Sequence, residues 1–213
     1  MLPGAKRTHP PKILRPQPGG KGITALILAG GKAKRMGGID KGLYKLADDR
    51  PIVEHVLSRI QPQVERVLIS ANRNREHYLH YGDTVVPDQK HRQWGPLAGV
   101  ASAMQTPLGD YLLVCPCDAP QLPLDLCERL CQGWIVGETE CILAHDGKRP
   151  QPLFCLLSST LGLKIDAYLD AGQRRVEQFM LGLNHQVVDF SDQSSAFLNI
   201  NTLEQIQGIH QDN

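Results

Sequence analysis

A segment near the amino end combines glycine and positive charge in a way that suits phosphate binding. The segment, LAGGKAKRMGGIDKG at 28–42, directly follows an apolar run. Glycine lets backbone N–H groups come close to a ligand, and successive N–H groups can form an anion-binding concavity. The segment also carries the cationic side chains of Lys32, Lys34, Arg35 and Lys41. We therefore expect it to wrap phosphate groups; the alternative is a flexible, basic surface loop.

The pattern within this segment differs from the two commonest phosphate-binding motifs. It contains no GxxxxGK[ST], as in a P-loop, and it is not a strict GxGxxG. Both absences argue against the nucleotide-binding folds that those motifs mark.

A carboxylate, Asp118, stands directly after another apolar run, in the stretch PCDAP. Mg²⁺ typically takes one or two protein carboxylates together with substrate phosphate oxygens, so Asp118 is our candidate magnesium ligand. The alternative is that Asp118 caps the next helix. That helix is expected to begin near Pro123, which is too far along the chain for such a cap.

Other polar residues follow the second and third apolar runs. Ser70, Asn72 and Asn74 come after the second run, and Asp88 comes after the third. Their donors and acceptors suit a nucleobase edge or a ribose, although residues of these types after a strand can equally cap a helix. Gly95 then opens a Gly-Pro turn before a stretch of small residues, which would let a flat ring lie close to the backbone.

Two asparagines near the carboxyl end share one side of an extended segment. They are Asn199 and Asn201 in the stretch FLNINT, and alternate residues of an extended chain point to the same face. Asn201 could cap the last helix instead of, or in addition to, facing a ligand.

Apolar runs alternate with segments of helical periodicity from residue 23 onward. The expected strands are 23–29, 64–71, 84–87, 110–117, 141–145, 153–157 and 185–190. The expected helices are 51–60, 75–81, 96–106, 122–134, 161–169, 174–182 and 201–209. This alternation predicts an α/β fold: a three-layer sandwich whose mostly parallel central sheet has helices on both faces. Ligands of such sheets bind at the carboxyl ends of the strands, where the polar residues above are found.

Composition limits the classes of function. Residues 1–22 are rich in proline, glycine and basic residues without any acid, so we expect a disordered basic arm, followed by a single domain at 23–213. The net charge of +1 indicates that any attraction for phosphate is local, and we do not expect nucleic acid as a partner. No apolar run has the length of a membrane span, which favours a cytoplasmic protein without membrane contact.

The six cysteines lie within apolar segments and not in the evenly spaced pattern of a disulfide framework. We expect them to be buried, reduced thiols. Cys115 and Cys117, or Cys127 and Cys131, could suggest zinc, but no His pair or further close Cys pair completes a usual ligand spacing.

The ordered set LAGGKAKRMGGIDKG, GPLAG, PCDAP, RPQPLF and NINT resembles the molybdenum cofactor guanylyltransferases, nucleotidyltransferases of the glycosyltransferase-A-like fold. The resemblance runs from about residue 23 to 208. It implies transfer of GMP from GTP to the phosphate of molybdenum-molybdopterin, with release of pyrophosphate and with Mg²⁺ as cofactor. It also implies molybdoenzymes or other proteins of the cofactor pathway as candidate partners.

The resemblance implies roles for individual residues. Arg35 and Lys41 would hold triphosphate oxygens and Asp118 would bind Mg²⁺, so these three are the catalytic candidates. The residues at the nucleotide, besides Lys41 and Asp118, would be Leu28, Ala29, Gly30, Gly31, Ser70, Asp88 and Gly95. The residues toward the pterin would be Gln151, Pro152, Asn199 and Asn201. Family members often have Asn where this chain has the shorter Ser70.

Two alternatives remain at this point. The same fold could serve a cytidylyltransferase for the same pterin or a sugar-phosphate nucleotidyltransferase. A carrier that binds and delivers the pterin cofactor without catalysis is the second alternative. The combined presence of Arg35, Lys41 and Asp118 argues against the carrier, because a binder needs no magnesium carboxylate.

Overall fold

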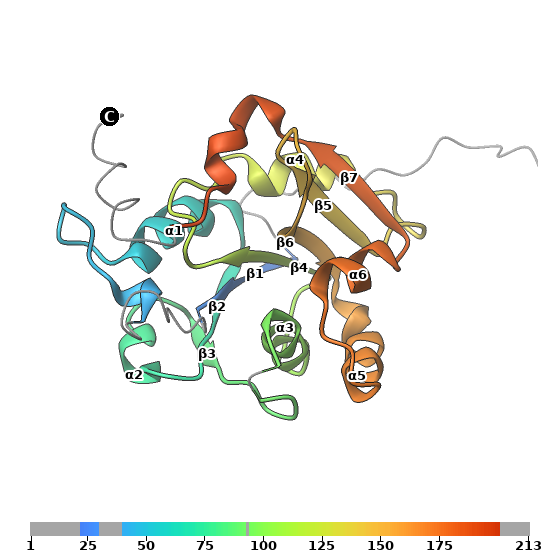
Figure 1. Cartoon of the computed structure of the whole chain (residues 1–213), viewed down its shortest axis with the longest axis horizontal. Helices are drawn as coiled ribbons and strands as arrows, with labels where there is room; N and C mark the ends of the chain where they lie inside the picture. The colour runs from blue at the N-terminus through green and yellow to red at the C-terminus, as the bar shows by residue number, and fades with distance from the viewer. Residues whose placement is uncertain (1–21, 30–39, 93, 201–213) are drawn as a thin grey trace, which may run out of the picture.

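A seven-stranded sheet forms the centre of the computed structural model, which describes residues 22–29, 40–92 and 94–200 (Figure 1). The strands in chain order are β1 (Ile23–Leu28), β2 (Arg66–Ser70), β3 (Thr84–Val86), β4 (Tyr111–Pro116), β5 (Cys141–His145), β6 (Pro150–Ser158) and β7 (His185–Asp189). Across the sheet their order is β3-β2-β1-β4-β6-β5-β7. Strands β3, β2, β1 and β4 are parallel, and β7 is parallel to β5.

Strand β6 runs antiparallel to both of its neighbours, β4 and β5. Val114 of β4 pairs with Cys155 of β6, so the first residues of β6 lie at the edge where β4 ends. The mostly parallel α/β sheet expected from the sequence is confirmed, with this one reversal inside it.

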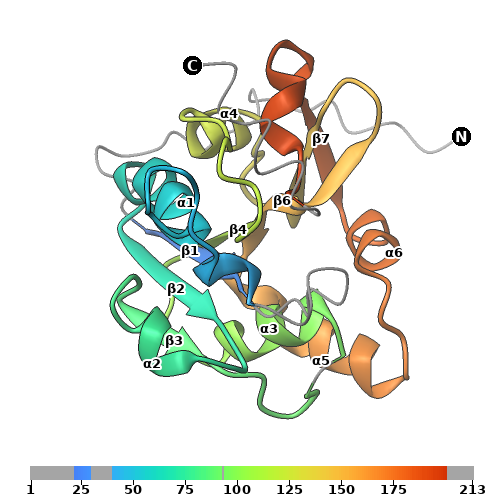
Figure 2. The same ribbon diagram turned by 60° about the vertical axis from the view of Figure 1, so that its left-hand side comes forward.

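Helices cover both faces of the sheet. The α-helices are α1 (Ile52–Ile60), α2 (Arg75–Tyr78), α3 (Pro96–Met104), α4 (Leu126–Gln132), α5 (Gly162–Asp170) and α6 (Val176–Leu181). Figures 1 and 2 show α1 and α4 on one face and α3 and α5 on the other. The residues of β1 alternate accordingly: Ala25 and Ile27 pack in the core under α1 and α4, and Leu26 packs in the core under α3, α5 and α6. This is the predicted three-layer arrangement.

Short 3₁₀ helices connect several of these elements. They are η3 (Lys41–Leu43), η4 (Gln61–Gln63), η5 (Ser159–Leu161) and η6 (Ser191–Phe197). The helix expected at 122–134 begins only at Leu126, and the helix expected at 75–81 ends at Tyr78. In the part of the chain that the structure describes, no helix combines the length and apolarity needed to cross a membrane. The expected basic arm at 1–22 and the expected helix at 201–209 lie almost wholly outside the described residues, and the domain boundary between 22 and 23 stays a prediction.

Candidate active site

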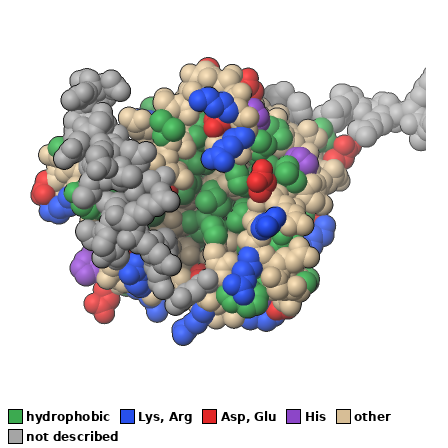
Figure 3. Space-filling view, viewed as in Figure 1, with side chains coloured by type: hydrophobic (Ala, Val, Ile, Leu, Met, Phe, Trp, Pro, Cys, Tyr) green, Lys and Arg blue, Asp and Glu red, His purple; other side chains and the backbone are tan. Residues whose placement is uncertain are grey.

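A pocket of about 520 Å³ lies where strands β1 to β4 end. Nine of the residues singled out in the sequence line it: Leu28, Ala29, Lys41, Ser70, Asn72, Asp88, Gly95, Asp118 and Asn199. Four others, Gly30, Gly31, Arg35 and Asn201, lie outside the described residues. Figure 3 shows that this side of the molecule is hollowed near its centre, with hydrophobic side chains in the hollow and Lys and Arg side chains around it.

Lys41 and Asp118 meet in this pocket, although they are far apart in the sequence. The Nζ atom of Lys41 donates a hydrogen bond to Oδ2 of Asp118 at 3.0 Å, and the two side chains are only 16% and 17% exposed. Lys41 begins η3, and Asp118 follows β4 directly. An ion pair this shielded from water is electrostatically stronger than a surface pair. The pair thus places a cation and a carboxylate side by side at the pocket.

The surroundings of Asp118 fit Mg²⁺ by the chemistry of the donor set. Its carboxylate lines the pocket, and its Oδ1 atom makes no hydrogen bond with any described residue. Among the residues that the structure describes, no group of three or more His, Cys, Asp or Glu side chains could hold a metal ion. An ion held here would therefore take most of its ligands from water and substrate oxygens, as Mg²⁺ usually does.

Asn72 and Asp88 form a reciprocal pair on another wall of the pocket. Asn72 Nδ2 donates to Asp88 Oδ2 at 2.8 Å, and the backbone N–H of Asp88 donates to Asn72 Oδ1 at 2.8 Å. Asp88 is only 5% exposed, so this pair fixes a nearly buried carboxylate at the ends of β2 and β3. Asn72 was noted in the sequence for its polar side chain, and the structure places it in the pocket.

Two glycines shape the start of helix α3 beside the pocket, one by its backbone conformation and one by close packing. Gly95, at its N-cap, has φ +88°, a conformation that L side chains rarely adopt. A Cβ atom on Gly99 would lie 2.5 Å from Ser70 Oγ and 3.1 Å from Leu28 Cδ2. The small residues noted in the sequence therefore bring the start of α3 against β1 and β2, at Leu28 and Ser70.

The segment after η6 reaches the pocket from the carboxyl end of the described chain. The backbone N–H of Ile200 donates to the carbonyl oxygen of Asp118 at 2.8 Å, and the neighbouring Asn199 lines the pocket. The expectation that Gln151 and Pro152 lie toward the pterin stays a prediction. These two residues of β6 are not among the lining residues, and Gln151 Nε2 instead donates to Asp146 Oδ2 at 2.7 Å. The residue of this strand that lines the pocket is Leu153.

Sequence reasoning missed several lining residues, among them Asp40, Arg73 and Cys117. Asp40 and Cys117 each directly precede a predicted site residue, and this adjacency was the available signal. The Cys117 thiol is buried, and burial followed by the nearby Asp118 charge raises its pKa well above the ordinary value. Cys117 is therefore held as a neutral thiol and is a poor nucleophile. All six cysteines are free and buried.

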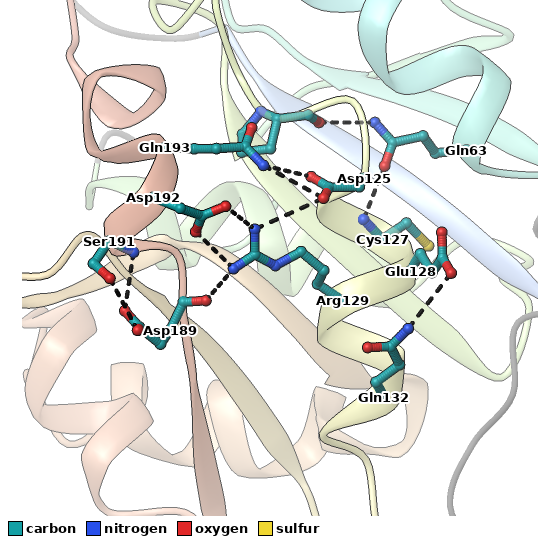
Figure 4. A network of polar contacts seen from close by, with 11 residues as sticks. Gln63, Asp125, Cys127, Glu128, Arg129, Gln132, Asp189, Ser191, Asp192 and Gln193 are labelled. Atoms are coloured by element: carbon teal, nitrogen blue, oxygen red, sulfur yellow. Dashed lines mark hydrogen bonds and ion pairs between the residues drawn. The ribbon is translucent and has the colours of Figure 1, made fainter.

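A polar network centred on Arg129 supports the segment that carries Asn199 (Figure 4). Arg129, on α4, makes two hydrogen bonds of 2.9 Å to the carboxylate of Asp192 in η6, and it also donates to the carbonyl oxygen of Asp189. Its guanidinium lies over the ring of Phe190 at 4.0 Å. Gln193 adds a hydrogen bond of 3.1 Å to Asp125. The network joins α4 to the end of β7 and to η6.

This network makes a testable contribution to stability against acid. The hydrogen bond from Arg129 lowers the pKa of Asp192 from its ordinary value of 3.8, and the Ser191 N–H lowers the pKa of Asp189. A folded-state pKa below the unfolded one means that the stabilisation is present above the unfolded value and is lost as the pH falls through the folded value. We therefore expect Arg129→Met to lower Tm at pH 7. The difference from the wild type should shrink below about pH 4.

Thermal melts between pH 3 and pH 8 at two salt concentrations measure this effect. High salt should reduce the difference at pH 7, because these carboxylates are exposed. Lys45→Met, which removes a more exposed ion pair with Asp49 elsewhere in the fold, is the matched control. A Tm difference for Arg129→Met that is the same at every pH would contradict an ion-pair contribution.

Comparison with known proteins places this pocket in a family. Residues 25–187 match the model of the MobA-like NTP transferase domain. The chain is 47% identical over 185 residues to a molybdenum cofactor guanylyltransferase of Shewanella halifaxensis, covering 87% of this chain and 92% of the relative. It is 48% identical over 186 residues to the protein of that name from Shewanella loihica, with 87% and 94% covered.

Solved structures share the fold at lower sequence identity. The molybdopterin-guanine dinucleotide biosynthesis protein A of Archaeoglobus fulgidus superposes with a TM-score of 0.71 at 19% identity, covering 87% of this chain and 95% of that one. A 4-diphosphocytidyl-2C-methyl-D-erythritol synthase from Anaerococcus prevotii gives a TM-score of 0.63 at 13% identity, with 87% and 93% covered. The domain match and the identity over most of the chain show that this protein belongs to the MobA-like NTP transferase family, together with the molybdenum cofactor guanylyltransferases.

Proposed function

We propose that this protein transfers GMP from GTP to the phosphate of molybdenum-molybdopterin, forming the guanine dinucleotide form of the cofactor and pyrophosphate. The names of the relatives at 47% and 48% identity support this specificity. The observation that carries it in the structure is the pairing of Lys41 with Asp118 inside a pocket at the strand ends. We further propose that the reaction requires Mg²⁺ and takes place in the cytoplasm, where GTP is supplied.

The bonds made and broken determine what the site must supply. An oxygen of the acceptor phosphate forms a bond to the α-phosphorus of GTP. The bond from that phosphorus to the bridging oxygen breaks, and pyrophosphate leaves with the electron pair. Both reactants are anions, and a phosphate at neutral pH is already deprotonated. The reaction therefore needs charge neutralisation and alignment more than it needs a general base.

The residues of the pocket suit these needs. Lys41 would neutralise charge on the transferring phosphates, and the backbone ends of β1 and β4, held together by the bond from Cys117 N–H to the Leu28 carbonyl, would border the nucleotide. The Asp118 carboxylate would hold Mg²⁺, which supplies charge stabilisation to phosphate oxygens when bound. Among the described lining residues there is no histidine, which agrees with a reaction that transfers little proton.

Guanine recognition is assigned to the wall formed by Asn72 and Asp88. The Watson–Crick edge of guanine carries N–H donors at N1 and N2, and a carboxylate accepts from both. Cytosine presents a ring-nitrogen acceptor at the matching position, which a carboxylate repels. Asp88 is nearly buried and is held by Asn72, so its position is preorganised for this purpose.

The test is calorimetry of the protein with GTP, CTP, ATP and UTP in the presence of Mg²⁺. We expect GTP to bind about 100-fold more tightly than CTP, since two buried hydrogen bonds at about 1.4 kcal/mol each give that ratio. Asp88→Asn should remove most of the preference, whereas Lys45→Ala, at an exposed residue outside the pocket, should leave it unchanged. Equal binding of CTP by the wild type would overturn the guanylyl assignment and favour the cytidylyl alternative.

The acceptor side of the pocket is proposed to be formed by Asn199 and Leu153, together with Gln151 and Pro152, which precede Leu153 on β6. The reaction distinguishes this enzyme from a carrier that only delivers the pterin. A carrier would bind the acceptor without consuming GTP. Release of pyrophosphate that requires both GTP and molybdenum-molybdopterin is the expected result. Candidate protein partners are then the molybdoenzymes or pathway proteins that receive the product.

A further inference from the structure

Asp40, the residue before Lys41, is held by two side chains from another part of the fold. Its Oδ1 atom accepts a hydrogen bond of 2.5 Å from the Tyr78 hydroxyl, and its Oδ2 atom accepts one of 3.0 Å from Asn74 Nδ2. Tyr78 is the last residue of α2, and Asn74 is the residue just before that helix. Helix α2 and the residue before it therefore hold Asp40, the residue that precedes Lys41, in place.

The Tyr78 side chain is suited to act as a fixed donor. It is fully buried in the core under α1, and burial raises its pKa above the ordinary value, so its hydroxyl stays protonated. Asn74 adopts a left-handed conformation, with φ 49°, in front of α2. Asn tolerates this conformation better than most residues do. Both donors are thereby fixed by the local fold before any ligand binds.

Gly42, the residue after Lys41, passes directly over the same hydroxyl. A Cβ atom at this position would lie 2.4 Å from Tyr78 Oη and 3.3 Å from the nearest ring carbons. Any side chain at this position would collide with the Tyr78 hydroxyl, which is the physical reason for glycine at 42. Tyr78 therefore contacts the residues on both sides of Lys41.

We propose that Tyr78 is a positioning residue: it fixes the turn at 40–42 through Asp40 and Gly42, and so aims the Lys41 ammonium at Asp118 and the transferring phosphates. The proposal rests on the role given to Lys41 under the proposed function. Tyr78 itself is not among the residues that line the pocket, so its effect on the reaction must pass through the turn.

The first test is Tyr78→Phe, which removes one oxygen atom and keeps the ring. We expect kcat for pyrophosphate release to fall by about 10-fold or more, since a small misplacement of a catalytic group is costly. Tyr168→Phe is the matched control, because it removes a hydroxyl that donates to the backbone carbonyl of Arg175 away from the pocket. The control should keep the wild-type kcat.

The second test is the combination of Gly42→Ala with Tyr78→Phe. Alone, Gly42→Ala should lower kcat and Tm, because the new methyl group meets the Tyr78 oxygen. In the double variant that oxygen is gone. We therefore expect the double variant to have the kcat of Tyr78→Phe and not the product of the two losses. It should also recover part of the Tm that Gly42→Ala loses. A role in core packing alone predicts the same recovery of Tm but no fall of kcat in Tyr78→Phe.

The third measurement needs no nucleotide and separates this proposal from the proposed function. Acetylation of Lys41 by a soluble active ester, followed by peptide mass spectrometry, should be several-fold faster in Tyr78→Phe than in the wild type. The exposed Lys45 serves as the internal control and should react at an unchanged rate. A wild type that releases no pyrophosphate would refute the function while the labelling still tests the turn. The positioning role is overturned if Tyr78→Phe matches Tyr168→Phe in both kcat and Lys41 labelling, or if the losses of the double variant are additive.

Discussion

Replacing Asp118 by Ala is expected to abolish Mg²⁺-dependent turnover while leaving the fold intact. The carboxylate lines the pocket and does not pack in either large hydrophobic core, so its loss costs little packing. A metal ion that stabilises the charge of the transition state is worth several kcal/mol, which corresponds to a fall in kcat of about 10³-fold or more. Metal-free binding of GTP should persist or tighten, because one negative charge near the triphosphate is removed.

The measurement is pyrophosphate release as a function of Mg²⁺ concentration, with circular dichroism as the control for folding. Asp110→Ala is the matched variant, because Asp110 directly precedes β4 at the opposite end of the strand that Asp118 follows. It should keep the activity of the wild type. If Asp118→Ala turns over normally with the same Mg²⁺ half-saturation, Asp118 is not the metal ligand and the proposed mechanism is wrong.

Replacing Lys41 by Ala is expected to lower kcat and to weaken GTP binding together. Lys41 lies 3.0 Å from Asp118 and would neutralise charge that is present in the bound triphosphate and grows during transfer. Removing one preorganised group of this kind typically costs on the order of 10² to 10³ in rate. The variant also leaves the Asp118 carboxylate without this cation in a shielded pocket, which should repel the triphosphate further.

Steady-state kinetics and GTP calorimetry on the same preparations test this prediction. Lys45→Ala, four residues further along the chain and exposed, should behave like the wild type in both measurements. A rise in KM with unchanged kcat would show that Lys41 binds the ground state and the transition state equally. An unchanged kcat would therefore remove Lys41 from the catalytic residues.

The fold was predictable because its signals are local and repeated. Each buried strand is a short apolar run, and the helices between strands carry apolar residues at helical spacing. The predicted order of strands and helices therefore stays the same even when an element boundary is misplaced by a few residues. The reversal of β6 was not predictable in this way. A strand buried on both faces has the same composition whichever way it runs, and its direction depends on the connection from β5, which is only four residues long between His145 and Pro150.

The site was predictable where a polar residue follows a strand directly. Asp88 and Asp118 each follow an expected strand directly, and Lys41 lies in the glycine-rich segment. Tyr78 has none: it is an aromatic residue in an apolar helical pattern, and only its hydroxyl reaches the turn at 40–42. Contacts of this kind depend on where two distant elements come to lie, and a sequence pattern carries no trace of them.

The reversal of the sheet at β6 has a consequence for how such enzymes diversify. The strands that border the proposed nucleotide site, β1 to β4, form one parallel block, whereas the proposed acceptor wall begins with the antiparallel β6 and the segment after η6. Substitutions in the second block can change the acceptor without disturbing the hydrogen-bond ladder of the first. Related enzymes can therefore change the acceptor substrate and keep the nucleotide. The boundary between the two parts of the site is the pairing of β4 with β6.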